Sequence, residues 1–391
     1  MEISSDHLLL DIYTAYLEAR RHKRHTRNQL RFEVNVEEEV MKLHSAITAR
    51  TYAPRRSVAF MVYKPVQREV FCADFADRVV HHLIFSYINP IFEQVFLPTS
   101  FSCRKGRGTL FGIRTMQRQL ALCTENHTRE AHILKLDVRG YFMSINRSLL
   151  FDELEKTLAH FRHLPAADGA AETWNDRLDY DLVFFLLRQI VFSDPVEGCL
   201  IKGDKKEWNG FPPSKTLFGQ QKGVGLPIGN LTSQLFSNIY LNRFDHWVVG
   251  ELGCSHYGRY VDDFYIIHQN ADYLKGLIPK IRDYLKRELR LTLHPSKVYF
   301  QNSRRGCAFL GAFVKDRQLL AGKRISGNFK AAACACTVSK SERQVVAKMN
   351  SYLGLLRHYS TRKLRKKVVE KFNSGKQYVV CGGYEKIRIR N

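Results

Sequence analysis

The sequence contains no apolar run long enough to form a membrane-spanning helix. Its N-terminus carries Asp6 and Asp11 within the first apolar run, so it does not resemble a signal peptide. The nine cysteines lack paired metal-type spacing; Cys334 and Cys336 are the nearest pair, with one residue between them. We therefore expect reduced thiols in a cytoplasmic protein.

Acidic residues are also scarce. The chain has 38 Asp and Glu against 61 Lys and Arg, which gives a net charge of +23 over 391 residues. An excess of this size predicts a polyanionic partner, nucleic acid first and an anionic membrane surface second. Residues 322–391 alone hold 17 Lys or Arg against 3 Glu and no Asp, so this segment carries +14 of the total. A further basic run, Arg20 to His25, is either a solvated face or a phosphate-contacting segment.

Hydrophobic periodicity and turn residues divide the chain into helices and strands. We expect helices over residues 6–50, 75–92, 112–122, 149–160, 178–192, 273–289 (starting or kinking at Pro279) and 322–391. We expect strands at 58–62, before residue 70, and at 132–138, 260–261, 264–267, 291–297 and 307–313. A helix should begin near Thr232 or Ser233, either of which could cap it. Residues 194–224 are rich in Gly, Pro and Lys and predict a mobile excursion or a hairpin.

Three carboxylates stand at places where chemistry is expected. Asp262 and Asp263 lie between two aromatic strand segments, where a hairpin would turn, and Asp137 ends the strand 132–138. In one antiparallel sheet a strand end and a hairpin can be neighbours. Burying adjacent carboxylates is costly without compensation, and oxygen ligands suit two Mg²⁺ ions, or Mn²⁺. Such a pair of ions is typical of phosphoryl transfer. The Asp262–Asp263 pair alone would suggest only a polar turn.

With these carboxylates in this order, the chain from about Tyr52 to Gly311 resembles a reverse transcriptase. The resemblance implies an α+β right-hand polymerase fold with fingers, a palm of antiparallel sheet backed by helices, and a helical thumb. It divides the chain into residues 1–130 (N-terminal helices and fingers), 131–320 (palm, with an excursion at about 161–224) and 321–391 (basic thumb). It also implies an RNA template, a DNA or RNA primer and dNTPs as partners, and no membrane.

The resemblance assigns roles residue by residue. Asp137, and Asp262 and Asp263 of the Tyr-Val-Asp-Asp hairpin, would be catalytic and hold the metal ions. Lys64 and Arg68, which by themselves could be surface residues, would hold the triphosphate. Phe142 would exclude a ribose 2′-hydroxyl. Lys297 would be the lysine near the leaving pyrophosphate. The primer grip would be formed by Phe309, Leu310 and Gly311.

One departure narrows the resemblance. Most relatives have Gln-Gly where this chain has Ile228-Gly229, and the segment Leu226 to Gln234 is similar to reverse transcriptases of diversity-generating retroelements. Those enzymes copy a template-repeat RNA with errors at adenines and act with a small basic accessory protein, the accessory variability determinant, expected to be oligomeric. An apolar Ile228 cannot hydrogen-bond a base pair as glutamine can, which should loosen discrimination by roughly 1–3 kcal/mol. Alternatively, Ile228 only packs.

Other functions remain open at this point. A retron, phage-defence or group II intron-like reverse transcriptase is the nearest alternative, although no extension for a maturase is evident after Gly311. A non-catalytic RNA-binding protein on a polymerase scaffold is a second class, against which the intact carboxylate set argues. A basic membrane-surface protein is a third, and no strongly basic amphipathic helix with a wide apolar face supports it.

Overall fold

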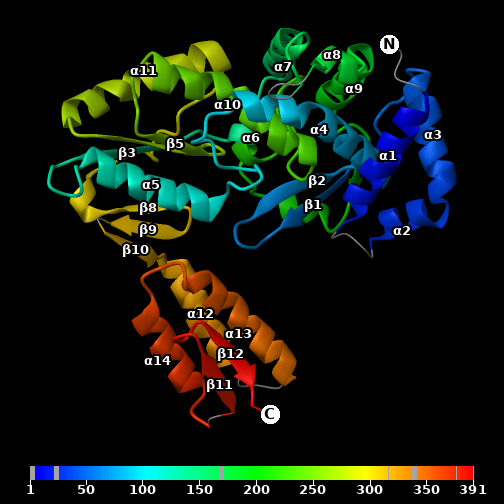
Figure 1. Cartoon of the computed structure of the whole chain (residues 1–391). Coiled ribbons are helices and arrows are strands. Elements are labelled where there is room, and N and C mark those ends of the chain that lie inside the picture. The colour runs from blue at the N-terminus through cyan, green and yellow to red at the C-terminus, as the bar shows by residue number, and fades with distance from the viewer. Residues whose placement is uncertain are drawn as a thin grey trace.

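The computed structural model describes residues 5–21, 26–166, 171–315, 317–335, 341–375 and 377–390. Residues 22–25 of the basic run, and Cys336, therefore lie outside the described residues. Figure 1 shows a large body formed by the chain up to β10 and a smaller C-terminal body, residues 322–390, that lies below it. The expected domain boundaries at 130/131 and 320/321 remain predictions.

A four-stranded antiparallel sheet occupies the centre of the large body. Its order is β5 (Tyr257–Tyr260), β6 (Asp263–His268), β3 (His132–Asp137) and β7 (Tyr299–Asn302). Helices α10 (Leu231–Gly250) and α11 (Ala271–Leu289) cover one face, and α5 (Thr109–Cys123) covers the other (Figure 1). The small antiparallel sheet β8 (Cys307–Phe309), β9 (Ala312–Lys315) and β10 (Gln318–Ala321) packs beside α5. The predicted fold class, an antiparallel sheet backed by helices, is confirmed.

Alternation along β3 explains why this strand is buried on both sides. Leu134 and Leu136 join the core formed with α10 and α11, whereas Ile133 joins the core formed with α5. The period of two leaves Lys135 and Asp137 on the same side as Ile133. Polar side chains can therefore appear at the end of an otherwise apolar strand, as the sequence predicted.

The large body holds a second, three-stranded sheet. Strands β1 (Val58–Val62) and β2 (Arg68–Cys72) form the expected hairpin, and β4 (Leu200–Ile201) pairs with β1 in parallel. The segment 194–224 is therefore not a hairpin of its own. The buried Glu69 holds it instead: the Glu69 carboxylate accepts from Trp208 Nε1 at 2.6 Å, Thr216 Oγ1 at 2.5 Å and Leu217 N at 2.7 Å. A sequence pattern could not reveal this long-range carboxylate anchor.

The remaining helices of the large body pack mainly with one another and with α10. They are α1 (Ser5–Arg20), α2 (Arg27–Val34), α3 (Val36–Thr48), α4 (Phe75–Val95), α6 (Tyr141–Ser144), α7 (Arg147–Phe161), α8 (Trp174–Arg177) and α9 (Tyr180–Phe192), with 3₁₀ turns at Lys205–Trp208, Pro213–Lys215 and Ser303–Arg305. None of the described helices is long and apolar enough to cross a membrane. Seven described cysteines are free thiols: Cys72, Cys103, Cys123, Cys199, Cys254, Cys307 and Cys381.

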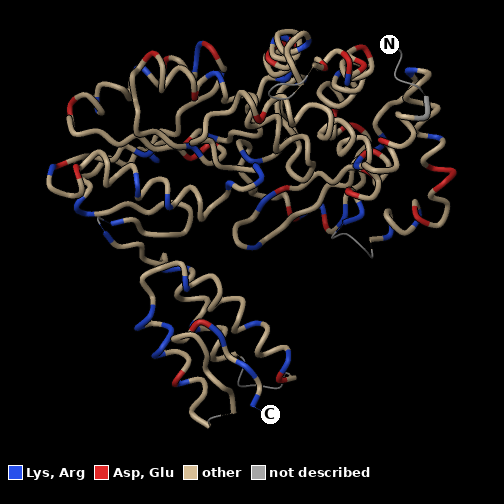
Figure 2. Tube along the Cα trace, viewed as in Figure 1, with Lys and Arg blue, Asp and Glu red and all other residues tan. Residues whose placement is uncertain are grey.

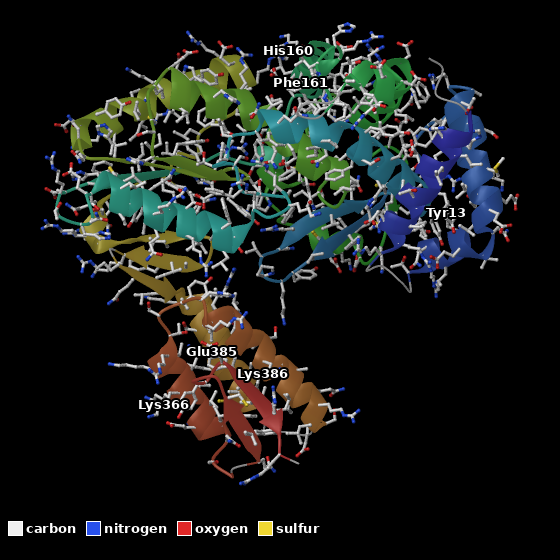
Figure 3. The ribbon with its side chains drawn as sticks, in the orientation of Figure 1. Tyr13, His160, Phe161, Lys366, Glu385 and Lys386 are labelled. Atoms are coloured by element: carbon white, nitrogen blue, oxygen red, sulfur yellow. The ribbon has the colours of Figure 1, made fainter. Side chains whose placement is uncertain are left out.

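The C-terminal body has its own core. Helices α12 (Lys323–Ala335), α13 (Glu342–Leu356) and α14 (Arg362–Phe372) pack with the hairpin β11 (Tyr378–Cys381) and β12 (Lys386–Ile389) around buried Phe329, Met349 and Ile387. The prediction of helix throughout was wrong for this hairpin. Figure 2 shows Lys and Arg positions along the trace of this body, and Figure 3 labels two lysines there, Lys366 and Lys386.

Four other expectations need correction. Residues 291–297 are no strand: only Leu293 makes a bridge, to Val138, and Pro295 has no N–H to donate. Segment 307–313 is a hairpin that turns at Leu310, whose φ is 50°. Helix α10 begins after Asn230 rather than at Thr232, because the Thr232 hydroxyl bonds His81 Nδ1 at 2.7 Å instead of capping. Helix α11 begins at Ala271 and includes Pro279.

Candidate active site

Strand pairing brings the three predicted carboxylates to one edge of the central sheet. Asp137 at the end of β3 lies directly opposite Asp263 at the start of β6, and Asp263 also pairs with Tyr260 of β5. Only Val261 and Asp262 are left for the turn between β5 and β6. Val261 adopts the left-handed region, with φ 58°, which is unusual for a β-branched residue.

Two lysines face two of these carboxylates. Lys297 Nζ lies 2.9 and 3.0 Å from the carboxylate oxygens of Asp137, and Lys135 Nζ lies 3.2 Å from Asp263 Oδ2. Lys135 also donates to the Ala308 carbonyl at 3.2 Å, which connects the carboxylate edge to the β8–β9 hairpin. Lys297, predicted to stand beside the leaving pyrophosphate, here neutralises Asp137.

The third carboxylate has no lysine of its own. Burial first, and then the negative charge of Asp137, raise the pKa of Asp262 to about 7. Burial also raises the pKa of Asp263, although the Lys135 ammonium lowers it. The edge therefore holds more negative charge than its lysines compensate.

These oxygen donors fit a divalent cation. Asp263 Oδ1 is buried and has no hydrogen-bond partner in the described part of the chain, so it keeps an unused acceptor. Carboxylate oxygens suit Mg²⁺ or Mn²⁺. As placed, however, no three His, Cys, Asp or Glu side chains of the described residues lie close enough together to hold an ion. Asp137 and Asp263 each face a lysine, and their roles as ligands remain predictions.

A buried polar network supports the turn from below. Arg259 and Asp245 are fully buried, with Arg259 Nη2 2.5 Å from Asp245 Oδ2 and Arg259 Nε 2.6 Å from Asp245 Oδ1. Arg259 Nη1 donates to the Val261 carbonyl at 2.9 Å, and Val261 N donates to Ser102 Oγ at 3.1 Å. The Ser102 hydroxyl donates to Asn238 Oδ1 at 2.8 Å. Both backbone polar groups of the strained Val261 are thereby fixed.

The charge of Arg259 is stabilised by this arrangement. Burial alone would lower its pKa, but the Asp245 carboxylate outweighs that effect and the pKa rises. Sequence analysis missed this network. Its only signal was Arg259 in an otherwise apolar strand, with Asn238 and Asp245 seven residues apart on the buried side of α10.

A cavity of about 570 Å³ opens at the carboxylate edge. It brings together most of the predicted site: the lining includes Arg68, Phe142, Ile228, Gly229, Asp262, Asp263 and Leu310. Lys64, Asp137, Lys297 and Gly311 are not in that lining. Lys64 lies in the exposed turn after β1, and Gly311 follows Leu310 in the β8–β9 turn.

The loop before α10 forms one wall of this cavity and is joined to β2. Phe71 N donates to the Ile228 carbonyl at 2.9 Å, and Ala73 N donates to Asn230 Oδ1 at 3.2 Å. Gly229 has φ 131°, and a Cβ there would lie 2.8 Å from the Phe71 carbonyl oxygen. Ile228 packs against the buried cluster around Phe71 as well as lining the cavity. The Ile228 side chain therefore has two roles, since it packs against the Phe71 cluster and also forms part of the cavity wall.

The lining also contains residues that sequence analysis did not assign. Ser214 and Lys215 come from the 194–224 segment, and Cys103 comes from the loop before α5. A Cβ at Gly140 would lie 2.4 Å from the Ser214 carbonyl oxygen, so only glycine fits there. The Pro-Pro-Ser-Lys sequence at 212–215 was the available signal for a loop held close to another backbone.

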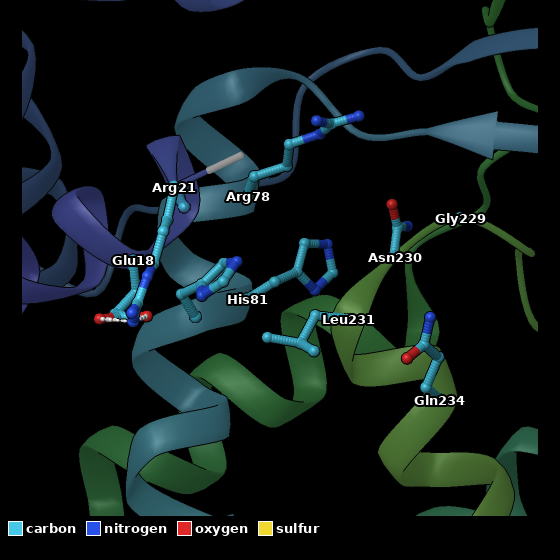
Figure 4. A pocket seen from close by; sticks show the side chains of 10 residues that line it. Glu18, Arg21, Arg78, His81, Gly229, Asn230, Leu231 and Gln234 are labelled. Atoms are coloured by element: carbon cyan, nitrogen blue, oxygen red, sulfur yellow. Dashed lines mark hydrogen bonds and ion pairs between the residues drawn. The ribbon is translucent and has the colours of Figure 1, made fainter. Parts of the chain in front are cut away.

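A second cavity, of about 480 Å³, lies on the other side of the same wall. Gly229, Asn230 and Gln234 line both cavities. Figure 4 shows Arg21, which follows α1, beside Glu18, with a hydrogen bond of 3.3 Å between them. His81 of α4 lies near Leu231 of α10, and the Arg78 side chain extends away from Leu231. Burial lowers the pKa of His81 to about 3, so this imidazole is neutral.

Comparison with known proteins finds similarity to one protein family. Residues 185–314 match the family model described as reverse transcriptase (RNA-dependent DNA polymerase). The matched range contains Asp262, Asp263 and the Ile228–Gly229 loop, and it ends beyond the β8–β9 turn. It covers about a third of the chain, so this part of the chain is similar to reverse transcriptases.

Individual relatives are distant. Protein YkfC of Escherichia coli (strain K12) is 23% identical over 172 residues, which cover 44% of this chain and 35% of YkfC. The chain thus matches about a third of that relative's length. A telomerase structure from Candida albicans with a fragment of telomeric RNA has a TM-score of 0.47, at 12% identity over 86% of this chain and 59% of that one. Apo telomerase from Candida tropicalis scores 0.48, at 12% identity over 82% and 59%. Both scores are below 0.5.

Proposed function

We propose that this chain is an RNA-directed DNA polymerase that extends a DNA or RNA primer on an RNA template with dNTPs. One observation carries the proposal. Asp137 and Asp263 are paired across β3 and β6, beside Asp262, at the edge of a cavity of about 570 Å³. The reverse transcriptase match over residues 185–314 supports the same activity.

The reaction joins a primer to a nucleotide. The primer 3′-oxygen bonds to the α-phosphorus, the bond to the bridging oxygen of pyrophosphate breaks, and the hydroxyl proton is lost to solvent. Divalent cations, two Mg²⁺ or Mn²⁺ in our proposal, supply charge neutralisation at the attacking and leaving oxygens. Asp137, Asp262 and Asp263 are the side chains that would hold them.

Other residues would position the incoming nucleotide. Arg68 lines the cavity and presents a planar fork suited to phosphate oxygens. Phe142 lines it too, and Leu226 N donates to the Phe142 carbonyl at 2.7 Å, which fixes the backbone under the proposed sugar position. Lys64 would reach the triphosphate only if its exposed turn approached the cavity. Lys297 would have to leave Asp137 to meet pyrophosphate.

The β8–β9 turn is the proposed primer grip. Leu310 lines the cavity, and Gly311 has φ 84°, so the turn depends on a residue that tolerates this conformation. The hydrogen bond from Lys135 to Ala308 holds this turn beside Asp263. A primer end resting on Leu310 would therefore meet the carboxylate edge.

Primer extension on RNA tests the activity. Wild-type protein with Mg²⁺ and dNTPs should elongate an annealed primer, and Asp262→Ala with Asp263→Ala should abolish elongation. The pair Asp272→Ala and Asp283→Ala is the matched control, because both residues are exposed on α11. Equal extension by the parent and the Asp262/Asp263 variant would contradict the site.

We propose further that the enzyme is of the diversity-generating retroelement type and makes adenine-mutagenic cDNA. Ile228 supports this: an apolar side chain, without a hydrogen-bonding group, forms the cavity wall where most relatives have glutamine. Ile228→Gln should lower misincorporation opposite template adenine, as measured by sequencing cDNA from a defined RNA. An unchanged error spectrum would restrict Ile228 to its packing role.

The same resemblance supports a small, basic accessory protein as a partner. Co-purification of the full chain with such a protein from its own operon, followed by extension assays with and without it, tests this pairing. Failure of the pair to associate would favour a retron, phage-defence or group II intron-like enzyme.

A further inference from the structure

The central sheet has a second polar end, away from the carboxylates. His132 at the start of β3 pairs with Asn302 at the end of β7. A cavity of about 490 Å³ lies there, lined by Glu130, His132, Phe300, Gln301, Asn302, Arg304 and Arg305. Asp137 is five residues further along β3, which at about 3.3 Å per residue places this cavity roughly 17 Å from the catalytic edge.

Two rings form a flat wall in this cavity. The His132 and Phe300 rings are stacked, with centroids 5.5 Å apart and planes inclined by 6°. Both residues remain half-buried rather than enclosed in the core. His132 Nδ1 has no hydrogen-bond partner among the residues that the structure describes. Stacked, partly open rings of this kind are surfaces on which nucleobases stack.

The other wall is cationic. Arg304 and Arg305 are exposed, and neither guanidinium has an ion-pair or hydrogen-bond partner among the described residues. The Asn302 side chain accepts from Arg304 N at 2.9 Å and so fixes the 3₁₀ turn that carries both arginines. The sole carboxylate of the lining, Glu130, accepts a hydrogen bond from the Asn302 amide. Two exposed guanidinium forks, without a carboxylate partner among the described residues, suit a phosphate joined to a base whose ring lies on the stack.

We propose that this cavity binds an unpaired nucleotide of a nucleic-acid strand, with its base on the His132–Phe300 stack and its phosphate at Arg304 and Arg305. The volume lies within the range usual for small-ligand pockets, about 300–1,000 Å³. The side-chain amide of Gln301 lies in the same lining and can meet a base edge. The site is separate from the polymerase cavity, and its binding does not require polymerase activity.

Fluorescence anisotropy on the full chain tests the site. An unlabelled RNA–DNA duplex in excess first occupies the duplex-binding surfaces, and 5′-fluorescein dodecauridylate or dodecathymidylate is then titrated. Arg304→Gln with Arg305→Gln should weaken binding at least fivefold and reduce the salt slope by about 1–2. Phe300→Ala should weaken binding roughly 5- to 150-fold, the range for loss of one stacked base.

The control removes the same charge elsewhere. Arg282→Gln with Lys286→Gln, both exposed on α11 and outside the cavity, should leave binding within twofold of wild type. Since Arg304 and Arg305 are exposed, their variant tests the site even if Phe300→Ala fails to fold. The probe that binds more tightly identifies the strand as RNA or DNA.

Two results would overturn the proposal. Equal weakening by the Arg304/Arg305 variant and the α11 control would mean that only net charge matters. Unchanged binding of both probes in the Arg304/Arg305 variant would mean that no nucleotide occupies the cavity. Extension of a preannealed primer should stay within twofold of wild type in this variant, so failure of the polymerase assay and failure of this site are distinguishable.

Discussion

The carboxylate edge of the central sheet and the C-terminal body both carry charges, but in opposite ways. At the edge, Arg259 and Asp245 are fully buried and fixed by hydrogen bonds of 2.5 and 2.6 Å. In the C-terminal body, Arg362, Lys363 and Lys367 of α14 are exposed and have no carboxylate partner in the described residues. Function at the edge should depend on where each charge stands, whereas function in the C-terminal body should depend on how many charges there are.

The largest effect should come from one carboxylate at the edge. Asp137→Asn keeps the shape but removes a charge that lies opposite Asp263, and should lower the primer extension rate by roughly 10³-fold. Asp152→Asn, an exposed residue on α7, is the control and should leave the rate unchanged. If the Asp137 variant extends primers at a rate within tenfold of wild type, the position of each charge matters less at this edge than we infer.

Next in size is the loss of the buried ion pair. Arg259→Gln leaves Asp245 buried without a counter-charge and should lower the free energy of unfolding by about 3–5 kcal/mol. Arg243→Gln breaks the exposed Arg243–Glu288 pair, 2.5 Å apart, and should cost about 1 kcal/mol or less. Urea denaturation of both variants compares the free energy of unfolding lost with a buried arginine of β5 and with an exposed arginine of α10. Similar losses would remove the distinction between buried and exposed charges.

The buried carboxyl of Asp77, which lies outside the site, should make the free energy of unfolding depend on pH. Asp77 accepts from Tyr52 Oη at 2.9 Å and Arg55 N at 2.9 Å, and burial raises its pKa to about 6. The folded state then holds a proton that the unfolded state has lost above its pKa of 3.8. The free energy of unfolding contributed by this group is therefore complete below pH 4 and is lost as pH rises through 6, by about 3 kcal/mol in total.

Asp77→Asn removes that proton equilibrium. Its free energy of unfolding should change less than that of the wild type between pH 4 and 7, as measured by urea denaturation at each pH. Parallel pH profiles for the two proteins would show that Asp77 titrates alike in the folded and unfolded chain.

The smallest effect should belong to the C-terminal body. Arg362→Gln, Lys363→Gln and Lys367→Gln together should weaken template–primer binding about tenfold and reduce its salt slope by about 2–3. Lys280→Gln, Arg282→Gln and Lys286→Gln remove three charges from α11 and should have little effect. If the C-terminal body binds duplex through particular contacts instead, one of the three substitutions will account for the whole loss.

The sequence predicted those parts of the fold that depend on local pattern. Alternation along 132–138 and the apolar stripe of α4 specified a strand and a helix, and the Tyr-Val-Asp-Asp hairpin followed from strand residues on both sides of Asp262 and Asp263. Each of these features is set by residues within a few positions of one another.

Long-range contacts set the parts that the sequence did not predict. The segment 194–224 is held by Glu69, more than a hundred residues earlier in the chain. Leu291 and Leu293 look like strand residues because both are buried, yet their backbone has no strand to pair with along its length. Arg259 is one arginine among many in a basic chain, and only the fold shows that Asp245 forms an ion pair with it.

Strand β3 also fixes the distance between the two sites at its ends. His132 borders the proposed nucleotide cavity and Asp137 the catalytic edge, and hydrogen bonds to β6 and β7 hold the intervening residues in register. The spacing of roughly 17 Å equals about five stacked nucleotides at 3.4 Å each. A nucleic-acid strand bound in the proposed nucleotide cavity would thus reach the catalytic edge after a set number of bases, whatever conformation the surrounding loops adopt.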